Sequence, residues 1–184
     1  MKSAGEPCRR NVVLVRRLPS PAGELLLGDF RGEVVLCDWT EGRRRGANAR
    51  RVQKALGAAF EEGDSPLLRR LREELGEYFA GKRRDFDLPV RYAGTPFEER
   101  VWNELRSIPY GETITYGELA RRVGNPAAAR AVAGANARNP VSILVPCHRV
   151  VAAGGPGGYG GGLAAKRTLL AIEADAPLYF SRKV

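Results

Sequence analysis

Long hydrophobic runs are missing from this 184-residue chain, although 43% of its residues are hydrophobic. A membrane-spanning helix needs about 20 consecutive apolar residues, and no stretch of the chain approaches that length. Residues 1–7 are followed by no apolar segment that could act as a secretory signal. The sequence therefore argues against a membrane protein and against an exported one, and we expect a cytoplasmic location.

Cysteine and histidine are also scarce, with three cysteines and a single histidine. Three cysteines do not make a disulfide framework, and a structural zinc site needs four cysteine or histidine ligands. Two of the four candidates, Cys147 and His148, are adjacent in a motif with another chemistry, so we predict no zinc site. Cys8 and Cys37 are left as either two buried thiols or one disulfide.

Acidic residues become rare in the second half of the chain. Residues 106–167 hold eight basic and two acidic residues, whereas residues 1–100 hold twenty basic and sixteen acidic ones. The formal net charge is +9. A surface of one sign suits a polyanion, of which nucleic acid is the commonest. An arginine-rich proteome would give the same total charge, so the charge alone leaves the partner open.

Three short segments near the N-terminus have the composition of β-strands. Residues 11–17, 23–28 and 33–39 are rich in leucine and β-branched residues, and glycine and proline separate them. This spacing predicts an antiparallel meander. The arginine-rich residues 42–51 follow and are typical of a turn.

Residues 65–80 are expected to form a helix. Ser65 suits the N-cap, Pro66 suits the first helical position, and the leucines that follow make one apolar face. A charged connector comes after this helix, and we place a domain boundary near residue 88. The chain is thus divided into an N-terminal domain, 1–88, and a C-terminal domain, 89–184.

The C-terminal domain opens with a capping box, because Thr95 and Glu98 flank a proline at the first helical position. This helix is expected to end before Pro109. Two further helices are predicted over 116–123 and 127–136, and together they resemble a helix-turn-helix.

Three more segments complete the C-terminal domain. Residues 141–145 are apolar and are expected to be buried and extended. Residues 154–162 are rich in glycine, and residues 164–174 are predicted to form the last helix.

The pair Cys147-His148 carries the clearest chemistry. A cysteine acts as a nucleophile through its thiolate, which needs a base or a positive charge nearby. His148 is the only imidazole in the chain. A buried cysteine is more often an inert part of the core, and adjacency does not establish geometry. Spacing alone leaves a structural and a reactive Cys147 almost equally open.

A longer pattern surrounds this pair. Residues 139–150 (NPVSILVPCHRV) closely resemble the active-site signature of the O6-alkylguanine-DNA alkyltransferases. Three other segments resemble the same family in the same order. Residues 111–120 (GETITYGELA) resemble the start of its helix-turn-helix, 124–132 (GNPAAARAV) its recognition helix, and 159–166 (YGGGLAAK) its pocket loop.

The resemblance spans residues 97–173, close to the whole C-terminal domain, whereas residues 1–88 match only loosely. It implies an α+β fold. The N-terminal α/β domain would be ribonuclease H-like with a small antiparallel sheet, and the C-terminal domain would be mainly helical with a helix-turn-helix.

The resemblance also implies a reaction. The family moves an alkyl group from O6 of guanine in DNA onto its own cysteine, once per molecule, and O4-alkylthymine would be a weaker substrate. Cys147 would be the acceptor, and Tyr116 would donate a proton towards the purine ring. His148 would take the thiol proton, relayed by water to Glu173, and Asn139 would tie the recognition helix to the active-site turn. No metal or cofactor takes part.

Double-stranded DNA is the implied partner, bound through its minor groove by a monomer at the prokaryotic nucleoid. The target base is flipped out of the duplex. Arg130 would fill its place in the stack, and Ala128 and Ala129 would allow close approach. Phosphate contacts are expected from Arg138, Arg121 and Arg122. The resemblance assigns the base pocket to Pro146, Cys147, Val150, Tyr159, Gly160 and Lys166.

Each assigned residue also has a plainer interpretation. Tyr116 could anchor its helix, Glu173 could be a solvated helix residue, Asn139 could be a C-cap, and the glycine run could be a linker. Asn136 departs from the apolar residue expected there, which leaves the preferred alkyl size open.

Three other functions were weighed against alkyl transfer. A lesion-sensing relative of the family binds DNA but lacks the acceptor cysteine. A helix-turn-helix regulator would not need the Cys-His pair, and a cysteine hydrolase would turn over many times.

Overall fold

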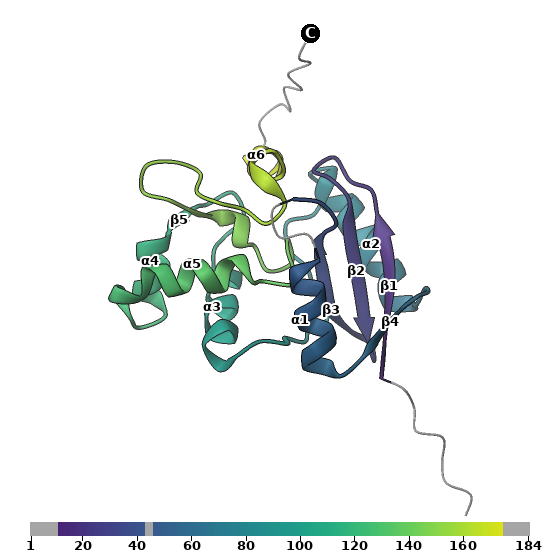
Figure 1. Ribbon diagram of the computed structural model, residues 1–184. Helices are drawn as coiled ribbons and strands as arrows, with labels where there is room; N and C mark the ends of the chain where they lie inside the picture. The colour runs from purple at the N-terminus through teal and green to yellow at the C-terminus, as the bar shows by residue number, and fades with distance from the viewer. Residues whose placement is uncertain (1–10, 43–45, 175–184) are drawn as a thin grey trace, which may run out of the picture.

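The computed structural model describes residues 11–42 and 46–174, which form a sheet with two helices joined to a mainly helical part (Figure 1). The α+β class expected from the sequence is confirmed. Within these residues, no helix is long and apolar enough to cross a membrane.

The sheet contains the three predicted strands and a fourth that was not predicted. Strands β1 (Val12–Leu18), β2 (Leu25–Phe30) and β3 (Glu33–Trp39) form the expected antiparallel meander. Strand β4 (Ala59–Glu62) adds to the far edge in parallel with β1, so the order is β3-β2-β1-β4. The prediction of a purely antiparallel sheet is therefore wrong at this edge.

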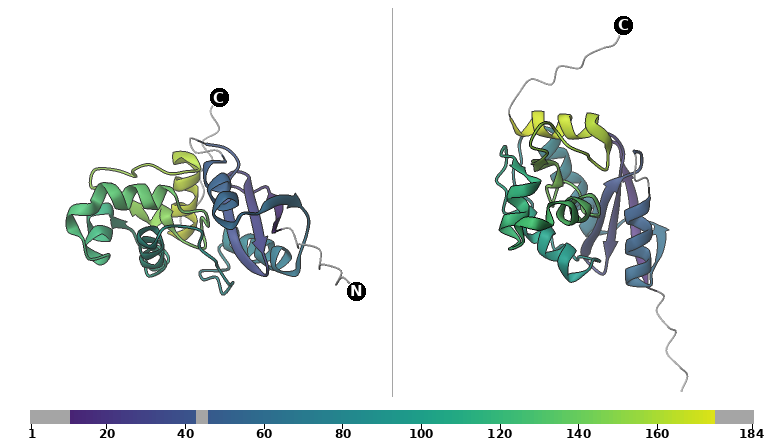
Figure 2. Two further views of the ribbon diagram at one scale, coloured as in Figure 1. Left: turned by 60° about the horizontal axis from the view of Figure 1, so that its bottom comes forward. Right: turned by 60° about the vertical axis from the view of Figure 1, so that its left-hand side comes forward.

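One helix covers each face of the sheet (Figure 2). Because strand side chains alternate between faces, β2 directs Leu25 and Leu27 to the core that holds helix α2 (Pro66–Phe79), while β1 directs Val13 to the core that holds Val52. As predicted, the hydroxyl of Ser65 caps α2 by accepting a hydrogen bond from the backbone N–H of Leu68, at 3.1 Å.

Val52 belongs to helix α1 (Ala47–Leu56), in a region predicted to be a turn. That prediction is wrong from residue 47 onward. Val52 is 1% exposed and packs on the sheet, so burial of one apolar face outweighs the turn-like, arginine-rich composition.

The C-terminal part contains four α-helices among its described residues. Helix α3 (Pro96–Arg106) begins with the predicted capping box, in which both reciprocal hydrogen bonds form. Helix α4 (Tyr116–Arg122) and helix α5 (Ala129–Ala137) make the predicted helix-turn-helix pair. Helix α6 (Gly162–Glu173) starts two residues earlier than predicted.

Short elements connect these helices. A 3-10 turn, η1 (Pro126–Ala128), precedes α5, so the predicted helix over 127–136 begins with a tighter turn. A second one, η2 (Cys147–Arg149), precedes strand β6 (Val150–Val151), which pairs in parallel with β5 (Ile114–Thr115).

The segment 141–145 is buried as predicted, but it is not a regular strand. Ile143 has a φ of 75°, a conformation that β-branched residues rarely adopt, and the chain folds back so that Ser142 and Val145 form a bridge. The resulting turn leads directly into Cys147.

Strand β3 joins the two parts of the molecule along its open edge. The backbone N–H of Cys37 donates to the carbonyl of Pro140 at 2.9 Å, and the N–H of Ser142 donates to the carbonyl of Cys37 at 2.7 Å. One apolar core also runs through both parts, from Leu25 to Leu169. The division of the chain at residue 88 stays a prediction, since the sheet and the helical part share this core.

Gly94 offers a test of the packing between these parts. A Cβ at residue 94 would lie 2.4 Å from the ring of Trp102, which is buried and donates a hydrogen bond from its indole N–H to Ala135. We expect Gly94→Ala to lower the free energy of unfolding by roughly 1–3 kcal/mol, because an overpacked core must shift. Urea unfolding at pH 7 measures this.

Gly76→Ala is the matched control. Gly76 lies within α2, and a Cβ there would meet nothing within 4 Å. This variant should be about 1 kcal/mol more stable than the wild type, because alanine is the better helix former. Equal effects of the two variants would contradict the packing argument.

Candidate active site

Asn139 fixes the turn that presents Cys147. Its side-chain N–H donates to the carbonyl of Val145 at 2.8 Å, and its side-chain oxygen accepts from the N–H of Val141 at 3.0 Å. Asn48 of α1 donates to the carbonyl of Asn139 at 3.2 Å. Helix α5 ends before Asn139, so this residue clamps the active-site turn and is not a C-cap.

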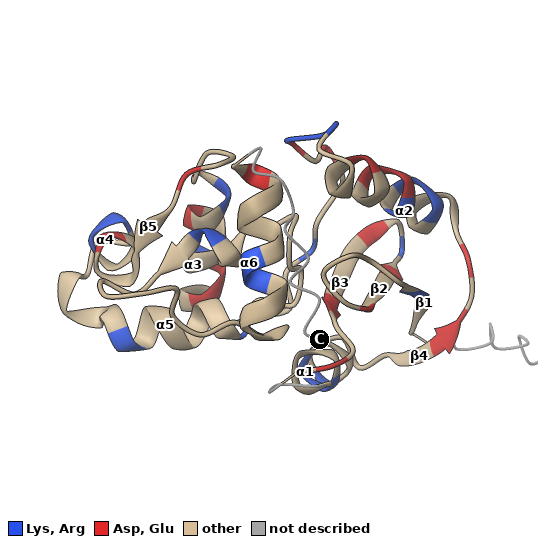
Figure 3. Cartoon of the chain, turned by 90° about the horizontal axis from the view of Figure 1, so that it is seen from above, with Lys and Arg blue, Asp and Glu red and all other residues tan. Residues whose placement is uncertain are grey.

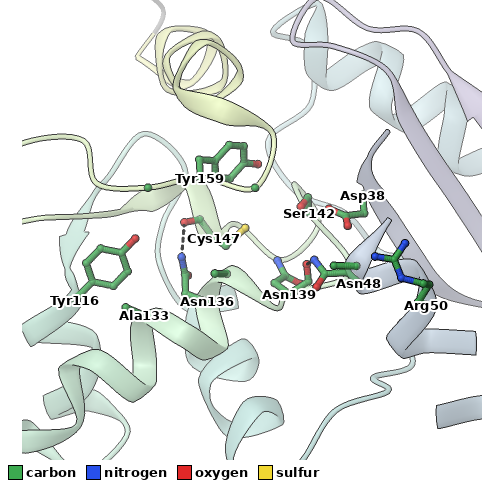
Figure 4. Close-up of a pocket in the computed structure, with 14 residues that line it drawn as sticks. Asp38, Asn48, Arg50, Tyr116, Ala133, Asn136, Asn139, Ser142, Cys147 and Tyr159 are labelled. Atoms are coloured by element: carbon green, nitrogen blue, oxygen red, sulfur yellow. Dashed lines mark hydrogen bonds between the residues drawn. The ribbon is translucent and has the colours of Figure 1, made fainter. Parts of the chain in front are cut away.

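A cavity of about 740 Å³ opens beside Cys147 (Figure 4). One side is lined by the helical part and the glycine-rich loop: Tyr116, Ala133, Asn136, Gly158, Tyr159 and Gly160. The opposite side is lined by the sheet, by α1 and by the active-site turn: Asp38, Ala47, Asn48, Arg50, Asn139 and Ser142. Cys147 lies between the two sides, and its sulfur points towards the second one (Figure 4).

The glycine-rich loop packs closely on the sheet. A Cβ at Gly161 would lie 2.5 Å from the ring of Trp39, so only glycine fits here. The ring of Tyr159 meets Trp39 edge-on, with centroids 5.9 Å apart. These contacts rule out a free linker and hold Tyr159 and Gly160 against the cavity.

Behind Cys147, His148 and Glu173 form a buried pair. The Nε2 atom of His148 lies 2.6 Å from Oε1 of Glu173, and both side chains are fully buried. The sequence predicted a relay from His148 by water to Glu173, whereas here the two side chains are in direct contact. The interpretation of Glu173 as a solvated helix residue is wrong, since it is 4% exposed.

Glu173 gathers donors from three other places. Arg149 donates to both carboxylate oxygens, at 2.8 and 3.0 Å, and the backbone N–H of Gly111 donates at 3.1 Å. The hydroxyl of Tyr78, from α2 on the sheet side, donates at 2.8 Å. A buried carboxylate is tolerated only when such partners satisfy it.

These partners decide the charge of the pair. Burial raises the pKa of Glu173, but the hydrogen bonds from His148 and Arg149 outweigh it and lower that pKa to about 2. Burial also lowers the pKa of His148, against the opposing effect of Glu173. The resting state is therefore a carboxylate beside a neutral imidazole.

A neutral His148 can act as a base. With the carboxylate at Nε2, that nitrogen carries the ring proton, so Nδ1 keeps a free lone pair. Nδ1 is buried and has no hydrogen-bond partner among the described residues. The imidazole is thus set up to accept a proton at Nδ1 while Glu173 stabilises the resulting charge.

The thiol of Cys147 is protonated at rest. Burial raises its pKa and Asp38 adds to this effect, whereas hydrogen bonds from Asn139 and Ser142 and the charge of Lys166 lower it. Burial likewise raises the pKa of Tyr116, with a smaller opposing effect from Asn136. A thiol and a phenol that both hold their protons face the same cavity.

Two carbonyls near Cys147 already accept one hydrogen bond each. Asn136 donates to the carbonyl of Cys147 at 3.3 Å, and the buried Lys166 donates to the carbonyl of Val150 at 2.6 Å. Lys166 also donates to Pro156, so it holds the glycine-rich loop. Each carbonyl keeps a second lone pair.

Not every predicted pocket residue lines the cavity. Cys147, Tyr116, Tyr159 and Gly160 do so, whereas Pro146, Val150 and Lys166 do not. Pro146 instead lines a smaller hollow of about 140 Å³ on another face.

The predicted DNA-contacting residues differ in their surroundings. Arg130, near the start of α5, is exposed and has no ion pair with another described residue. Ala128 and Ala129 are half-buried beside it. Arg138 instead forms an ion pair with the buried Glu98, and Arg121 pairs with Glu118 on the surface of α4.

The predicted one-signed surface needs one correction. Arg149 and Lys166 were counted towards it, but both are buried and bind Glu173 and backbone carbonyls. Figure 3 shows the remaining basic residues of the helical part alongside acidic ones on α3 and α4.

The expected absence of zinc concerns a region that is partly outside the structure. Cys8 lies outside the described residues, and Cys37 is a buried free thiol. Among residues 11–42 and 46–174, no three histidine, cysteine or acidic side chains come together as metal ligands.

Comparison with known proteins supports the family resemblance. Residues 96–175 match the model of the 6-O-methylguanine DNA methyltransferase DNA-binding domain. A methylated-DNA–protein-cysteine methyltransferase from Methanosarcina acetivorans is 52% identical over 157 residues, which are 85% of this chain and 95% of the relative. This chain belongs to the methylated-DNA–protein-cysteine methyltransferase family.

Other relatives agree with this assignment. A family member from Mycolicibacterium paratuberculosis is 56% identical over 102 residues, 55% of this chain and 62% of its own length. The chain thus spans less than two thirds of the mycobacterial relatives it matches. The crystal structure of Mycobacterium tuberculosis OGT in complex with DNA superposes with a TM-score of 0.76, at 39% identity over 90% of this chain and 96% of that one.

Several site residues were not found from the sequence. Asp38, Asn48 and Arg50 line the cavity from segments far from the family motifs, and Asn48 and Arg50 lie in the stretch predicted to be a turn. Tyr78 was assigned to an apolar helix face, and nothing in the sequence indicates that its hydroxyl reaches Glu173. Asn136 was noticed only as a departure from the family pattern.

Tyr78→Phe tests the contribution of the sheet side to the buried pair. The variant removes one hydrogen bond to a charged acceptor, so we expect the free energy of unfolding at pH 7 to fall by about 1.5–3 kcal/mol. Urea unfolding measures this.

Tyr110→Phe is its control, because the hydroxyl of Tyr110 donates to a neutral acceptor, the carbonyl of Ile172, at 3.1 Å. Its loss should be near 1 kcal/mol. A Tyr78→Phe loss no larger than that of Tyr110→Phe would mean that Tyr78 contributes little to holding Glu173.

Proposed function

We propose that this protein repairs DNA directly, by transferring the alkyl group of O6-alkylguanine to its own Cys147 in a single turnover. The observation that carries the proposal is the position of Cys147, in the wall of an open cavity and next to the buried His148–Glu173 pair. Family membership supports the same reaction. O4-alkylthymine is the weaker substrate.

The chemistry suits these residues. His148 takes the thiol proton of Cys147 at Nδ1, through a water, and Glu173 stabilises the imidazolium. The thiolate attacks the alkyl carbon, the new S–C bond forms, and the bond from that carbon to O6 breaks. The guanine leaves as an anion and takes a proton from Tyr116. His148 then loses its proton to solvent, and Tyr116 regains one. The thioether is stable, so the protein is consumed.

A thiolate suits this displacement because it is a soft nucleophile and the target is a saturated carbon. Held as a thiol until substrate binds, Cys147 is also protected from other alkylating agents and from oxidation. The raised pKa of Cys147, due first to burial, supports this order of events.

The DNA partner binds at the helix-turn-helix, through its minor groove, and the damaged base is flipped into the cavity. Arg130 enters the stack in place of that base, which its exposure and its lack of an ion pair with described residues support. Arg138 and Arg121 stay paired with Glu98 and Glu118 and weigh less in phosphate binding. The protein acts as a monomer in the cytoplasm, at the nucleoid.

Mass spectrometry tests the reaction. After incubation with excess duplex DNA containing one O6-methylguanine, we expect one added methyl group per molecule, located on Cys147 by peptide mapping. Cys147→Ala should add no mass and should still bind the DNA.

Two results would contradict the proposal. Binding of the lesion by the wild type without added mass would indicate a lesion sensor. Repeated release of product by one molecule would indicate a hydrolase.

Arg130→Ala tests the base-flipping role. Unstacking a base costs a few kcal/mol, and Arg130 would offset part of it, so we expect repair in duplex DNA to slow by roughly tenfold or more. The reaction with free O6-benzylguanine should keep its rate, because no base is unstacked there.

Arg16→Ala removes the same charge from β1, on the sheet side, and should leave both rates within about twofold. If Arg130→Ala slowed the reactions with duplex and free base equally, Arg130 would act on the active site and not on flipping.

A further inference from the structure

The cavity beside Cys147 is larger than a flipped base requires. Its volume of about 740 Å³ lies within the range of roughly 300–1,000 Å³ that holds whole drug-sized ligands. Asp38, Asn48, Arg50 and Ser142 line the part of it beyond Cys147, and we call this part the far lobe (Figure 4). The far lobe combines the sheet and α1 with the active-site turn.

The proposed reaction, on which this inference rests, determines what enters the far lobe. The guanine must lie on the side of Tyr116, which donates its proton. In a displacement the sulfur, the transferred carbon and O6 lie in one line, so the rest of the substituent must extend sideways from that line. The sulfur of Cys147 points away from Tyr116 and towards the far lobe (Figure 4), so the space for the substituent lies there.

Two acceptors in the far lobe are buried. Asn48 is 2% exposed, and its side-chain oxygen has no hydrogen-bond partner among the described residues. Its side-chain N–H is already bound to Asn139, which orients that oxygen. The carboxylate of Asp38, 7% exposed, lines the same space. A buried acceptor left without a donor is costly, so a ligand that supplies a donor gains from this site.

We propose that the far lobe binds the substituent on O6 and selects substituents that donate a hydrogen bond, such as hydroxyalkyl groups, over apolar ones of the same size. The N-terminal part of the chain thereby takes part in substrate recognition. The transferred group ends as a thioether on Cys147, with its hydroxyl directed to Asp38 and Asn48.

Arg50 limits the class of substituent. Its exposed side chain also lines the cavity and would repel an ammonium group, so a neutral hydroxyl is the appropriate probe. A matched pair of substituents is O6-(2-hydroxyethyl)guanine and O6-propylguanine, which differ by a terminal hydroxyl in place of a methyl group.

The experiment measures single-turnover transfer rates from duplex DNA that carries O6-methyl-, O6-(2-hydroxyethyl)- or O6-propylguanine. We expect the wild type to react with the hydroxyethyl substrate roughly tenfold faster than with the propyl substrate, because one hydrogen bond to a buried acceptor is gained. Equal rates, or a faster propyl reaction, would overturn the inference while methyl transfer still upheld the proposed function. No transfer from any substrate would overturn the proposed function itself.

Variants connect the preference to the far lobe. In Asn48→Leu and in Asp38→Asn, the ratio of hydroxyethyl to propyl rates should fall, towards one in the leucine variant. The ratio is measured within each variant, so a general loss of reactivity cancels.

Glu41→Gln is the matched control, because Glu41 is exposed, follows β3 and does not line the cavity. It should keep the wild-type ratio. A ratio unchanged in both far-lobe variants would show that the preference arises elsewhere and would overturn the assignment.

Discussion

The buried carboxylate of Glu173 is the interaction on which the rest of the structure depends. A charge removed from water is costly unless each of its oxygens is satisfied, and here Tyr78, Gly111, His148 and Arg149 do so. These four partners come from the sheet side, from the loop before the helix-turn-helix and from the turn after Cys147. The need to satisfy one carboxylate therefore aligns segments that are far apart in the chain.

The reactive turn is held in the same way from its other end. Strand β3 pairs with the chain on either side of Val141, and Asn48 binds the carbonyl of Asn139. An open sheet edge would otherwise present unpaired backbone groups, and here the active-site segment covers it. The sheet is thus more than a support, because it sets the turn from which Cys147 projects and forms one wall of its cavity.

Sequence reasoning succeeded where local rules and motifs were sufficient. The strands, helix α2 with its Ser65 cap and the capping box of α3 follow from hydrophobic spacing and cap chemistry, which act over a few residues. It failed at α1, whose composition is turn-like and whose helix depends on packing Val52 against the sheet. It also failed at Ile143, whose positive φ is imposed by the buried turn.

The sequence by itself determined the family, the identity of Cys147 as the candidate nucleophile and the pairing of a cysteine with the only histidine, because these are carried by contiguous motifs. Only the tertiary structure decided which polar atoms meet. It brings Tyr78 to Glu173 and Asn48 to the cavity, and it removes Arg149 and Lys166 from the surface. The physical reason is that burial and hydrogen-bond satisfaction depend on neighbours distant in the chain, which no local pattern encodes.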